Sequence, residues 1–194
     1  MKSSSTLKQL RVADSAPQAW RNGGGSTREL LAWPAGADWR VRVSVAEIAA
    51  DGPFSAFDGV ERWFAVLSGA GVALGLPGGE HRLTPTSAPL RFDGSAAPGC
   101  RLVDGATSDL NLMLRAGTRG VLKRALSDAP WTEDWRWRAA FVTDRARLEG
   151  TDGLRVELEA GTLLAPLPPG PCRLVASRAT APMFWIGVDA DVEV

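Results

Sequence analysis

The sequence has few of the residues that metal sites and disulfide frameworks require. Its 194 residues include one histidine, His81, two cysteines, Cys100 and Cys172, and no tyrosine. One imidazole cannot supply the ligand set of an ordinary transition-metal site, and no Cys-x-x-Cys pair or carboxylate cluster replaces it. Two cysteines are too few for a disulfide framework. We therefore expect no metal and no cofactor, with His81 exposed at a hairpin tip and both cysteines buried.

Charge of one sign and long hydrophobic runs are also lacking. The 22 basic and 22 acidic residues cancel, and no apolar run approaches the length of a membrane span. Without a basic excess, nothing points to nucleic acid or to an anionic membrane as a partner. The segment 1–9 lacks the apolar core of a signal peptide. We expect a cytoplasmic protein with no nucleic-acid and no membrane partner.

The patterns that are present are those of β-strands. From Trp39 to Val45, apolar and polar residues alternate with a period of two, and 21 glycines and 13 prolines interrupt the chain. Short strands at regular spacing predict an all-β sandwich or barrel. One short helix is expected at 121–127. Further strands are expected at 60–67, 72–76, 90–92, 110–114, 135–142, 154–158, 162–167, 172–176 and 183–188.

The chain contains a faint internal repeat. Residues 98–103, Pro-Gly-Cys-Arg-Leu-Val, are similar to residues 170–175, Gly-Pro-Cys-Arg-Leu-Val, and an Ala-Thr pair and an apolar strand follow each copy. A duplicated β unit explains this order.

The two copies differ in their last strand. The first copy carries Asp109 and Asn111 there, whereas the second carries Met183 and Trp185. We therefore expect any binding site in the first copy, and a filled core at the equivalent place in the second.

Residues 20–30 combine a turn with the start of a strand. Gly23, Gly24 and Gly25 permit positive φ angles and a close approach of backbone, and Asn22 favours a turn. The segment is not a phosphate-binding loop, because no Gly-Lys-Ser/Thr follows and the next element is a strand. A plain glycine hairpin and a hairpin beside a ligand site both fit the residues.

These motifs resemble the HutD/Ves family of bacterial bicupins. The resemblance implies an all-β fold with two cupin-like β-barrel or jelly-roll units in one compact chain, and little helix. It also implies a link to histidine utilisation or to the stress response, without a settled activity. We expect a first unit at 1–117 that carries the pocket and a degenerate second unit at 118–194, with an exchange of strands left open. The motifs that carry the resemblance are residues 20–29, 39–48, 51–62, 92–94 and 104–113.

The candidate ligand-binding residues are charged or polar side chains in otherwise apolar strands. Glu47 continues the apolar face of Val41, Val43 and Val45, so we expect a buried carboxylate there that needs an arginine partner. Asn111 lies on the strand face opposite three leucines and could point inward. The residues predicted to line a pocket are Arg28, Glu47, Arg62, Asp109 and Asn111.

Two interpretations of these five residues stay open. They are either structural ion pairs or a pocket in which a planar arginine fork binds a carboxylate and Asn111 binds an amide or a similar group. Four other arginines are expected on solvated faces: Arg40, Arg42, Arg136 and Arg138.

The sequence favours a binding protein over an enzyme, because no nucleophile or catalytic histidine is evident. We expect a metal-independent accessory or regulatory protein whose partner is a small carboxylate. The family resemblance points to a histidine-degradation intermediate such as formylglutamate. The alternative is a metal-independent isomerase or hydrolase with Glu47 or Asp109 as general base. Whether the chain forms a homodimer stays open.

Overall fold

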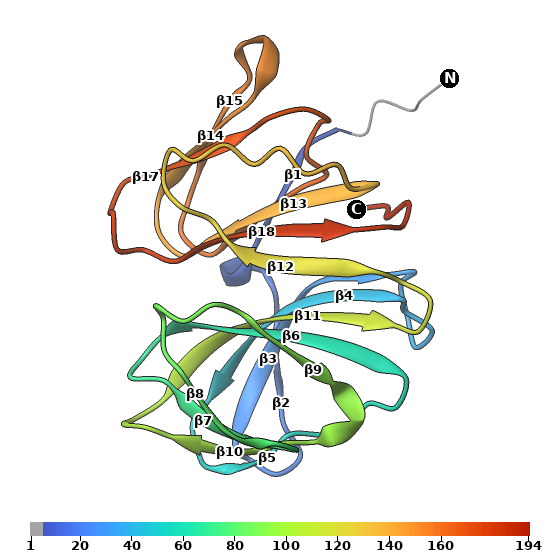
Figure 1. The fold of residues 1–194 in the computed structure, drawn as a ribbon, viewed down its shortest axis with the longest axis vertical. Coiled ribbons are helices and arrows are strands. Elements are labelled where there is room, and N and C mark those ends of the chain that lie inside the picture. Colours follow the sequence, from blue (N-terminus) through green and yellow to red (C-terminus); the bar gives the residue numbers. More distant parts are fainter. Residues whose placement is uncertain (1–5) are drawn as a thin grey trace. The chain divides into compact units, whose positions relative to one another are not determined.

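The computed structural model describes residues 6–194, and nearly all the regular structure in this range is β-strand (Figure 1). The all-β prediction is confirmed. The chain divides into two compact units. The first unit is Ser15–Thr118, and the second unit is Arg119–Val194 together with the described residues up to Asp14. No helix within residues 6–194 is long and apolar enough to cross a membrane.

The first unit contains two antiparallel sheets, whose strands are blue to green in Figure 1. The pairing of strands does not close them into a barrel. The larger sheet runs in the order β2 (Pro17–Ala19), β3 (Gly25–Trp33), β4 (Val41–Ile48), β11 (Thr107–Arg115), β6 (Val60–Ser68) and β9 (Leu90–Asp93). The smaller sheet runs in the order β5 (Gly52–Pro53), β10 (Gly99–Leu102), β7 (Val72–Leu76) and β8 (Gly79–Leu83).

The second unit also contains two sheets, which are likewise not closed into a barrel. The larger sheet runs in the order β1 (Lys8–Arg11), β16 (Thr162–Ala165), β13 (Trp137–Val142), β18 (Met183–Val188) and β12 (Gly120–Arg124). The smaller sheet runs in the order β15 (Arg155–Leu158), β14 (Ala146–Glu149) and β17 (Arg173–Ala176). Three short 3-10 turns complete the described structure: η1 (Val12–Asp14), η2 (Gly94–Ala96) and η3 (Thr151–Gly153).

The two units repeat the same strand order, which confirms the predicted duplication. The strands β4-β11-β6-β9 of the first unit correspond to β12-β18-β13-β16 of the second. The strands β10-β7-β8 correspond in the same way to β17-β14-β15. The similar segments 98–103 and 170–175 supply β10 and β17, as the repeat in the sequence requires.

The helix predicted at 121–127 is wrong. Residues 120–124 form strand β12, which pairs with β18. Val121 and Leu122 are both buried, so the strand lacks the alternation that would have identified it.

Each unit has its own apolar core. Phe64, Leu74 and Cys100 pack in the first unit, and Leu148 and Cys172 pack in the second. Both cysteines are free and buried, as predicted. His81 is exposed on β8, close to the hairpin tip where it was expected.

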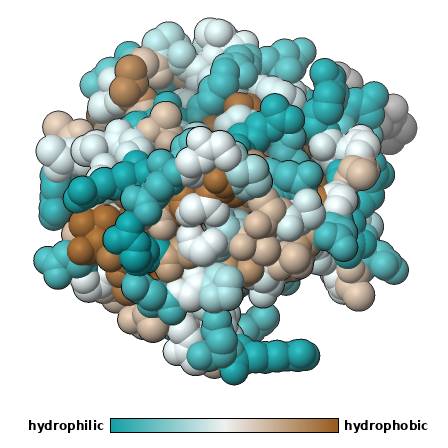
Figure 2. Space-filling view, turned by 60° about the horizontal axis from the view of Figure 1, so that its bottom comes forward, coloured by the Kyte–Doolittle hydropathy of each residue, from teal (hydrophilic) through white to brown (hydrophobic). Residues whose placement is uncertain are grey.

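The surface is mostly hydrophilic on the face drawn in Figure 2, where hydrophobic side chains occupy small separate areas. Among the described residues, Leu126 is the exposed large hydrophobic side chain, at 66%. Apolar surface is therefore concentrated inside the units, where it stabilises the sheets.

Candidate functional site

A pocket of about 790 Å³ lies in the first unit, against the larger sheet. This volume is within the range of pockets that hold small ligands. The residues around it come from the turn between β2 and β3, from strands β3, β4, β6 and β11, and from the segment 53–57. We refer to it as the large pocket.

The pairing of strands explains which side chains line the large pocket. Arg42 on β4 lies opposite Met113 on β11, and Met113 lies opposite Arg62 on β6. Ser44, Asn111 and Phe64 form the next row. Because directly paired residues project to the same face of a sheet, these two rows form one wall of the pocket.

Arg62 is the central charged group of this wall. Its side chain is only 7% exposed, and its guanidinium donates one hydrogen bond, from Nη2 to Asn111 Oδ1 at 2.9 Å. Its buried Nε has no acceptor. The Cζ atom lies 4.9 to 5.7 Å from the ring centroids of Phe54, Phe57 and Phe92. Arg62 is therefore a buried cation held by aromatic rings and an amide, and no carboxylate of residues 6–194 pairs with it.

Burial and a neighbouring charge both act on this guanidinium. Desolvation, together with the smaller effect of the positive charge of Arg42, lowers the pKa of Arg62 to about 10. Arg62 still carries its charge near neutral pH. A buried cation of this kind is stabilised by any anion that enters the pocket.

Arg42 is the second arginine in the wall of the large pocket. The prediction that it lies on a solvated face is therefore wrong. Its side chain is 17% exposed, and its Nε donates to Glu29 Oε2 at 2.7 Å. Arg138 was also expected on a solvated face but is buried in the second unit. Arg40 and Arg136 are exposed, as predicted.

The glycine-rich segment forms the rim of the large pocket. Trp20 Nε1 donates to Thr27 Oγ1 at 2.8 Å, and Asn22 Oδ1 accepts from Gly24 N at 3.1 Å. At Gly25 an added Cβ would lie 2.2 Å from the Glu47 carbonyl oxygen, so only glycine allows β3 to approach β4 there. The segment is both a hairpin between β2 and β3 and a wall of the pocket.

Three of the five predicted site residues lie on the inward face of their strands. Arg62 and Asn111 line the large pocket. Asp109 precedes Asn111 by two residues on β11, so it shares that face, but it is fully buried and accepts from Thr107 Oγ1 at 2.8 Å. Desolvation raises the pKa of Asp109 to about 7, against a smaller lowering by Thr107.

Arg28 and Glu47 lie on the opposite face of the sheet, which corrects their predicted convergence with the other three. Thr27 and Ala46 line the pocket, so their neighbours Arg28 and Glu47 point away from it. Arg28 donates to the Ser15 carbonyl oxygen. Glu47 is exposed, because it lies near the end of β4, and it is not the buried carboxylate that the pattern predicted.

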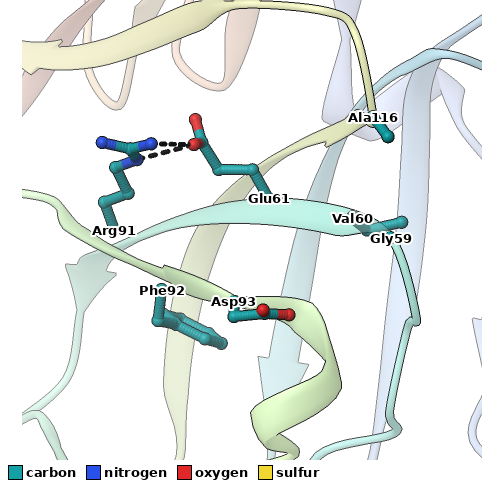
Figure 3. Close-up of a pocket in the computed structure, with 7 residues that line it drawn as sticks. All are labelled: Gly59, Val60, Glu61, Arg91, Phe92, Asp93 and Ala116. Atoms are coloured by element: carbon teal, nitrogen blue, oxygen red, sulfur yellow. Dashed lines mark hydrogen bonds and ion pairs between the residues drawn. The ribbon is translucent and has the colours of Figure 1, made fainter.

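A smaller hollow of about 490 Å³ lies beside β6 and β9 (Figure 3). Its arginine is already paired, because Arg91 Nε donates to Glu61 Oε2 at 2.6 Å, and its remaining charged side chain, Asp93, accepts from Ser95. Phe92 extends to the other side of β9 from this ion pair (Figure 3) and contacts Arg62 instead. The buried arginine without an ion-pair partner, Arg62, therefore belongs to the large pocket. Within residues 6–194, no group of three or more His, Cys, Asp or Glu side chains is placed to hold a metal.

Comparison with known proteins assigns the chain to a family. The model of the HutD family matches residues 12–165. The chain belongs to the HutD family.

HutD relatives match the chain in sequence and in fold. An uncharacterised 21.2 kDa protein encoded in the region 3′ of hutC in Pseudomonas putida is 38% identical over 56% of this chain and 58% of its own. The Ves protein of Citrobacter koseri is 42% identical over 50% of this chain and 51% of its own, so the match spans little more than half of these curated relatives. A conserved protein of unknown function from Pseudomonas aeruginosa PAO1 has a TM-score of 0.85 at 28% identity, covering 96% of this chain and 100% of that one.

This HutD protein has a second buried arginine, on the strand of the second unit that corresponds to β6. Arg62 lies opposite Met113, two residues after Asn111 on β11. Arg138 lies opposite Gly187, two residues after Trp185 on β18. Arg62 and Arg138 therefore lie on corresponding strands, β6 and β13, and both are buried in their own units.

The terminal guanidinium nitrogens of Arg138 in this HutD protein are hydrogen-bonded within the second unit. Its guanidinium donates to the carbonyl oxygens of Pro168, Gly170 and Trp131 at 2.7 to 3.2 Å, and to Cys172 Sγ at 3.4 Å. Met183 and Trp185 are buried in the core of the second unit, as predicted. The buried Nε of Arg138 lacks an acceptor among the described residues, as that of Arg62 does. The two arginines differ at their terminal nitrogens, which have four acceptors in the second unit and one, Asn111 Oδ1, in the first.

Proposed function

We propose that this HutD protein binds a small carboxylate in the large pocket, with the Arg62 guanidinium as the principal anchor. The supporting observation is the contrast between two buried arginines on corresponding strands of the two units. Arg138 has four acceptors within its unit, but Arg62 has only Asn111 Oδ1. A carboxylate would supply the missing acceptors, because its two oxygens match the parallel donors of a guanidinium.

The aromatic rings around Arg62 prepare it for this role. Phe54, Phe57 and Phe92 surround the guanidinium, and Asn111 fixes one of its nitrogens. A donor that is already oriented loses little freedom when a ligand binds. The wall also offers the Ser44 hydroxyl and the Asn111 amide for a polar group of the ligand.

The role that we propose is accessory or regulatory, with a histidine-degradation intermediate such as formylglutamate as ligand. The ligand class follows from the family and from the relative encoded near hutC. A cytoplasmic location is part of the proposal, since two buried free thiols fit a reducing compartment.

Binding is favoured over catalysis by the positions of the two candidate bases. A general base must reach the proton that it removes. Glu47 is exposed on the opposite face of the sheet, and Asp109 is fully buried and does not line the pocket. The enzymatic alternative therefore rests on Asp109 alone.

Calorimetry with glutarate and N-formylglutamate tests the proposed anchor. Arg62→Lys keeps the charge but loses the planar fork, and breaking one side of a buried charged hydrogen-bonded pair costs about 2–5 kcal/mol. We expect affinity to fall by about 30-fold or more.

The matched control for this experiment is Arg136→Lys, because Arg136 is exposed in the other unit. Its affinity should equal that of the wild type. Equal affinity of the wild type and Arg62→Lys would contradict the proposal, and loss of bound acid with release of a product would instead support an enzyme.

A further inference from the structure

The large pocket carries more positive charge than one carboxylate needs. Its lining includes three arginines, Arg21, Arg42 and Arg62, and no acidic residue. Arg42 is neutralised by Glu29 at 2.7 Å. The other two remain without an ion-pair partner, in a chain whose formal net charge is zero.

Arg21 lies at the rim of the pocket, in a turn whose backbone is fixed. Gly23 N donates to the Trp20 carbonyl oxygen at 3.0 Å, and Trp20 N donates to the Gly25 carbonyl oxygen at 2.9 Å. The Trp20 indole is held by Thr27. The backbone of the turn is thus anchored on both sides of Arg21, while the Arg21 side chain is exposed and forms no hydrogen bond or ion pair with a described residue.

The lack of a partner sets Arg21 apart from most arginines of this chain. Exposed arginines such as Arg91, Arg101 and Arg173 pair with a neighbouring carboxylate. Arg82 also lacks a partner among the described residues, but it lies on β8 and does not line the pocket. Arg21 and Arg62 are therefore the arginines that line the large pocket without an ion-pair partner among the described residues, and Arg21 is the one at its rim.

We propose that Arg21 determines the specificity of the site by binding a second anionic group, so that the pocket prefers dianionic over monoanionic ligands. The inference rests on the proposed function, in which Arg62 binds the first carboxylate deep in the pocket. The second group then lies at the rim, where Arg21 contacts it. This arrangement selects short acids with a charge at each end.

Glutarate and its monoamide, glutaramate, provide a matched pair of probes. They have nearly the same shape and differ by one negative charge, so the difference in affinity measures recognition of the second anion. By calorimetry we expect the wild type to bind glutarate about 1.5- to 5-fold more tightly, which is the range for an exposed ion pair. The preference should shrink at higher ionic strength, because a rim charge is screened.

Arg21→Gln should lower the affinity for glutarate to that for glutaramate and leave glutaramate unchanged. Arg82→Gln makes the same change of charge outside the pocket and should preserve the preference. Arg62→Lys should weaken both ligands together, since both place a carboxylate at the anchor.

The outcomes separate the two proposals. Equal binding of glutarate and glutaramate by the wild type, or an unchanged preference in Arg21→Gln, would overturn the role of Arg21 and leave the anchor at Arg62 intact. Failure of the wild type to bind either compound would overturn the proposed function and this inference with it. The thermal midpoint of Arg21→Gln should match that of the wild type, which excludes unfolding as the cause of any loss.

Discussion

Asp109 is a buried carboxyl group without a cation beside it. It is fully inaccessible, its sheet neighbours are Ala46 and Val66, and its Oδ1 has no hydrogen-bond partner. Burial raises the pKa of Asp109 from 3.8 to about 7, so the folded protein favours the protonated acid. This group therefore stabilises the fold least at high pH. Its contribution to the free energy of unfolding falls as pH rises from about 4 to about 7 and is constant above that range.

Asp109→Asn should remove this pH dependence, because an amide stays neutral while it still accepts from Thr107. At pH 8 we expect the variant to be more stable than the wild type by on the order of 2–4 kcal/mol. At pH 4 the two proteins should differ little. Urea unfolding at both pH values measures the difference, and Asp104→Asn, at an exposed position, is the control. A difference between Asp109→Asn and wild type that stays constant from pH 4 to pH 8 would contradict a raised pKa.

At the scale of elements, the two units differ in the connection between equivalent strands. In the first unit, the segment between β4 and β6 places Phe54 and Phe57 beside the large pocket. In the second unit, the segment between β12 and β13 contributes Trp131, which stacks on Trp185 at a centroid distance of 5.0 Å. The same position in the fold is thus a pocket wall in one unit and a core in the other.

Trp131→Ala should strongly destabilise the protein, because it empties part of this core and exposes the site of Arg138. Replacing a large buried aromatic residue with alanine costs about 3–5 kcal/mol. Phe57→Ala removes a half-buried ring from the corresponding segment and should cost clearly less. Urea unfolding followed by far-UV circular dichroism compares the two variants. Equal losses would contradict the view that Trp131 lies in a buried core and Phe57 at its margin.

Two strands were predicted accurately from the sequence, one from its alternation and one as a short apolar segment. The alternation after Trp39 predicts β4, and the predicted segment 183–188 agrees with β18. Strand β12 was missed because its neighbouring residues Val121 and Leu122 are both buried. A short continuous apolar segment has no period of two, so it can be taken for a helix.

The candidate site was predictable only in part, for a related reason. Alternation shows that Arg42 and Arg28 lie on particular faces of their strands, but not which polar face borders a cavity. That depends on the pairing of β4 with β11, which places Arg42 opposite Met113 and Ser44 opposite Asn111. The prediction that Glu47 is buried was wrong, because Glu47 lies near the end of β4, where that face of the strand is exposed.

Across the whole molecule, histidine and cysteine donors for a metal centre are few, and residues 6–194 contain no cluster of metal-binding side chains. His81 is exposed on β8, and the two cysteines lie in the cores of different units. Burial raises the pKa of the Cys100 thiol to about 12, and the charges of Asp109 and Asp51 act in the same direction. A thiol in this state is a poor ligand, because metals bind the thiolate.

Protein purified without a histidine tag should therefore contain iron, zinc, nickel and manganese well below one equivalent per chain. Elemental analysis by mass spectrometry measures this directly. A sample loaded with zinc and then desalted is the control, and it should lose the added metal. About one retained equivalent of any of these metals would show a site that the donors of residues 6–194 do not explain.

Strand β1 gives the second unit an unusual order of assembly. Lys8 to Arg11 pair with Ala165 to Thr162, about 150 residues later in the chain. During synthesis, all strands of the first unit emerge before the partner of β1 has been made. Strand β1 must therefore stay without its partner while the first unit folds, and it can join its sheet only after β16 has been made. A fragment that starts at Ser15 would keep every strand of the first unit but would leave β16 as an unprotected edge, open to pairing with another chain.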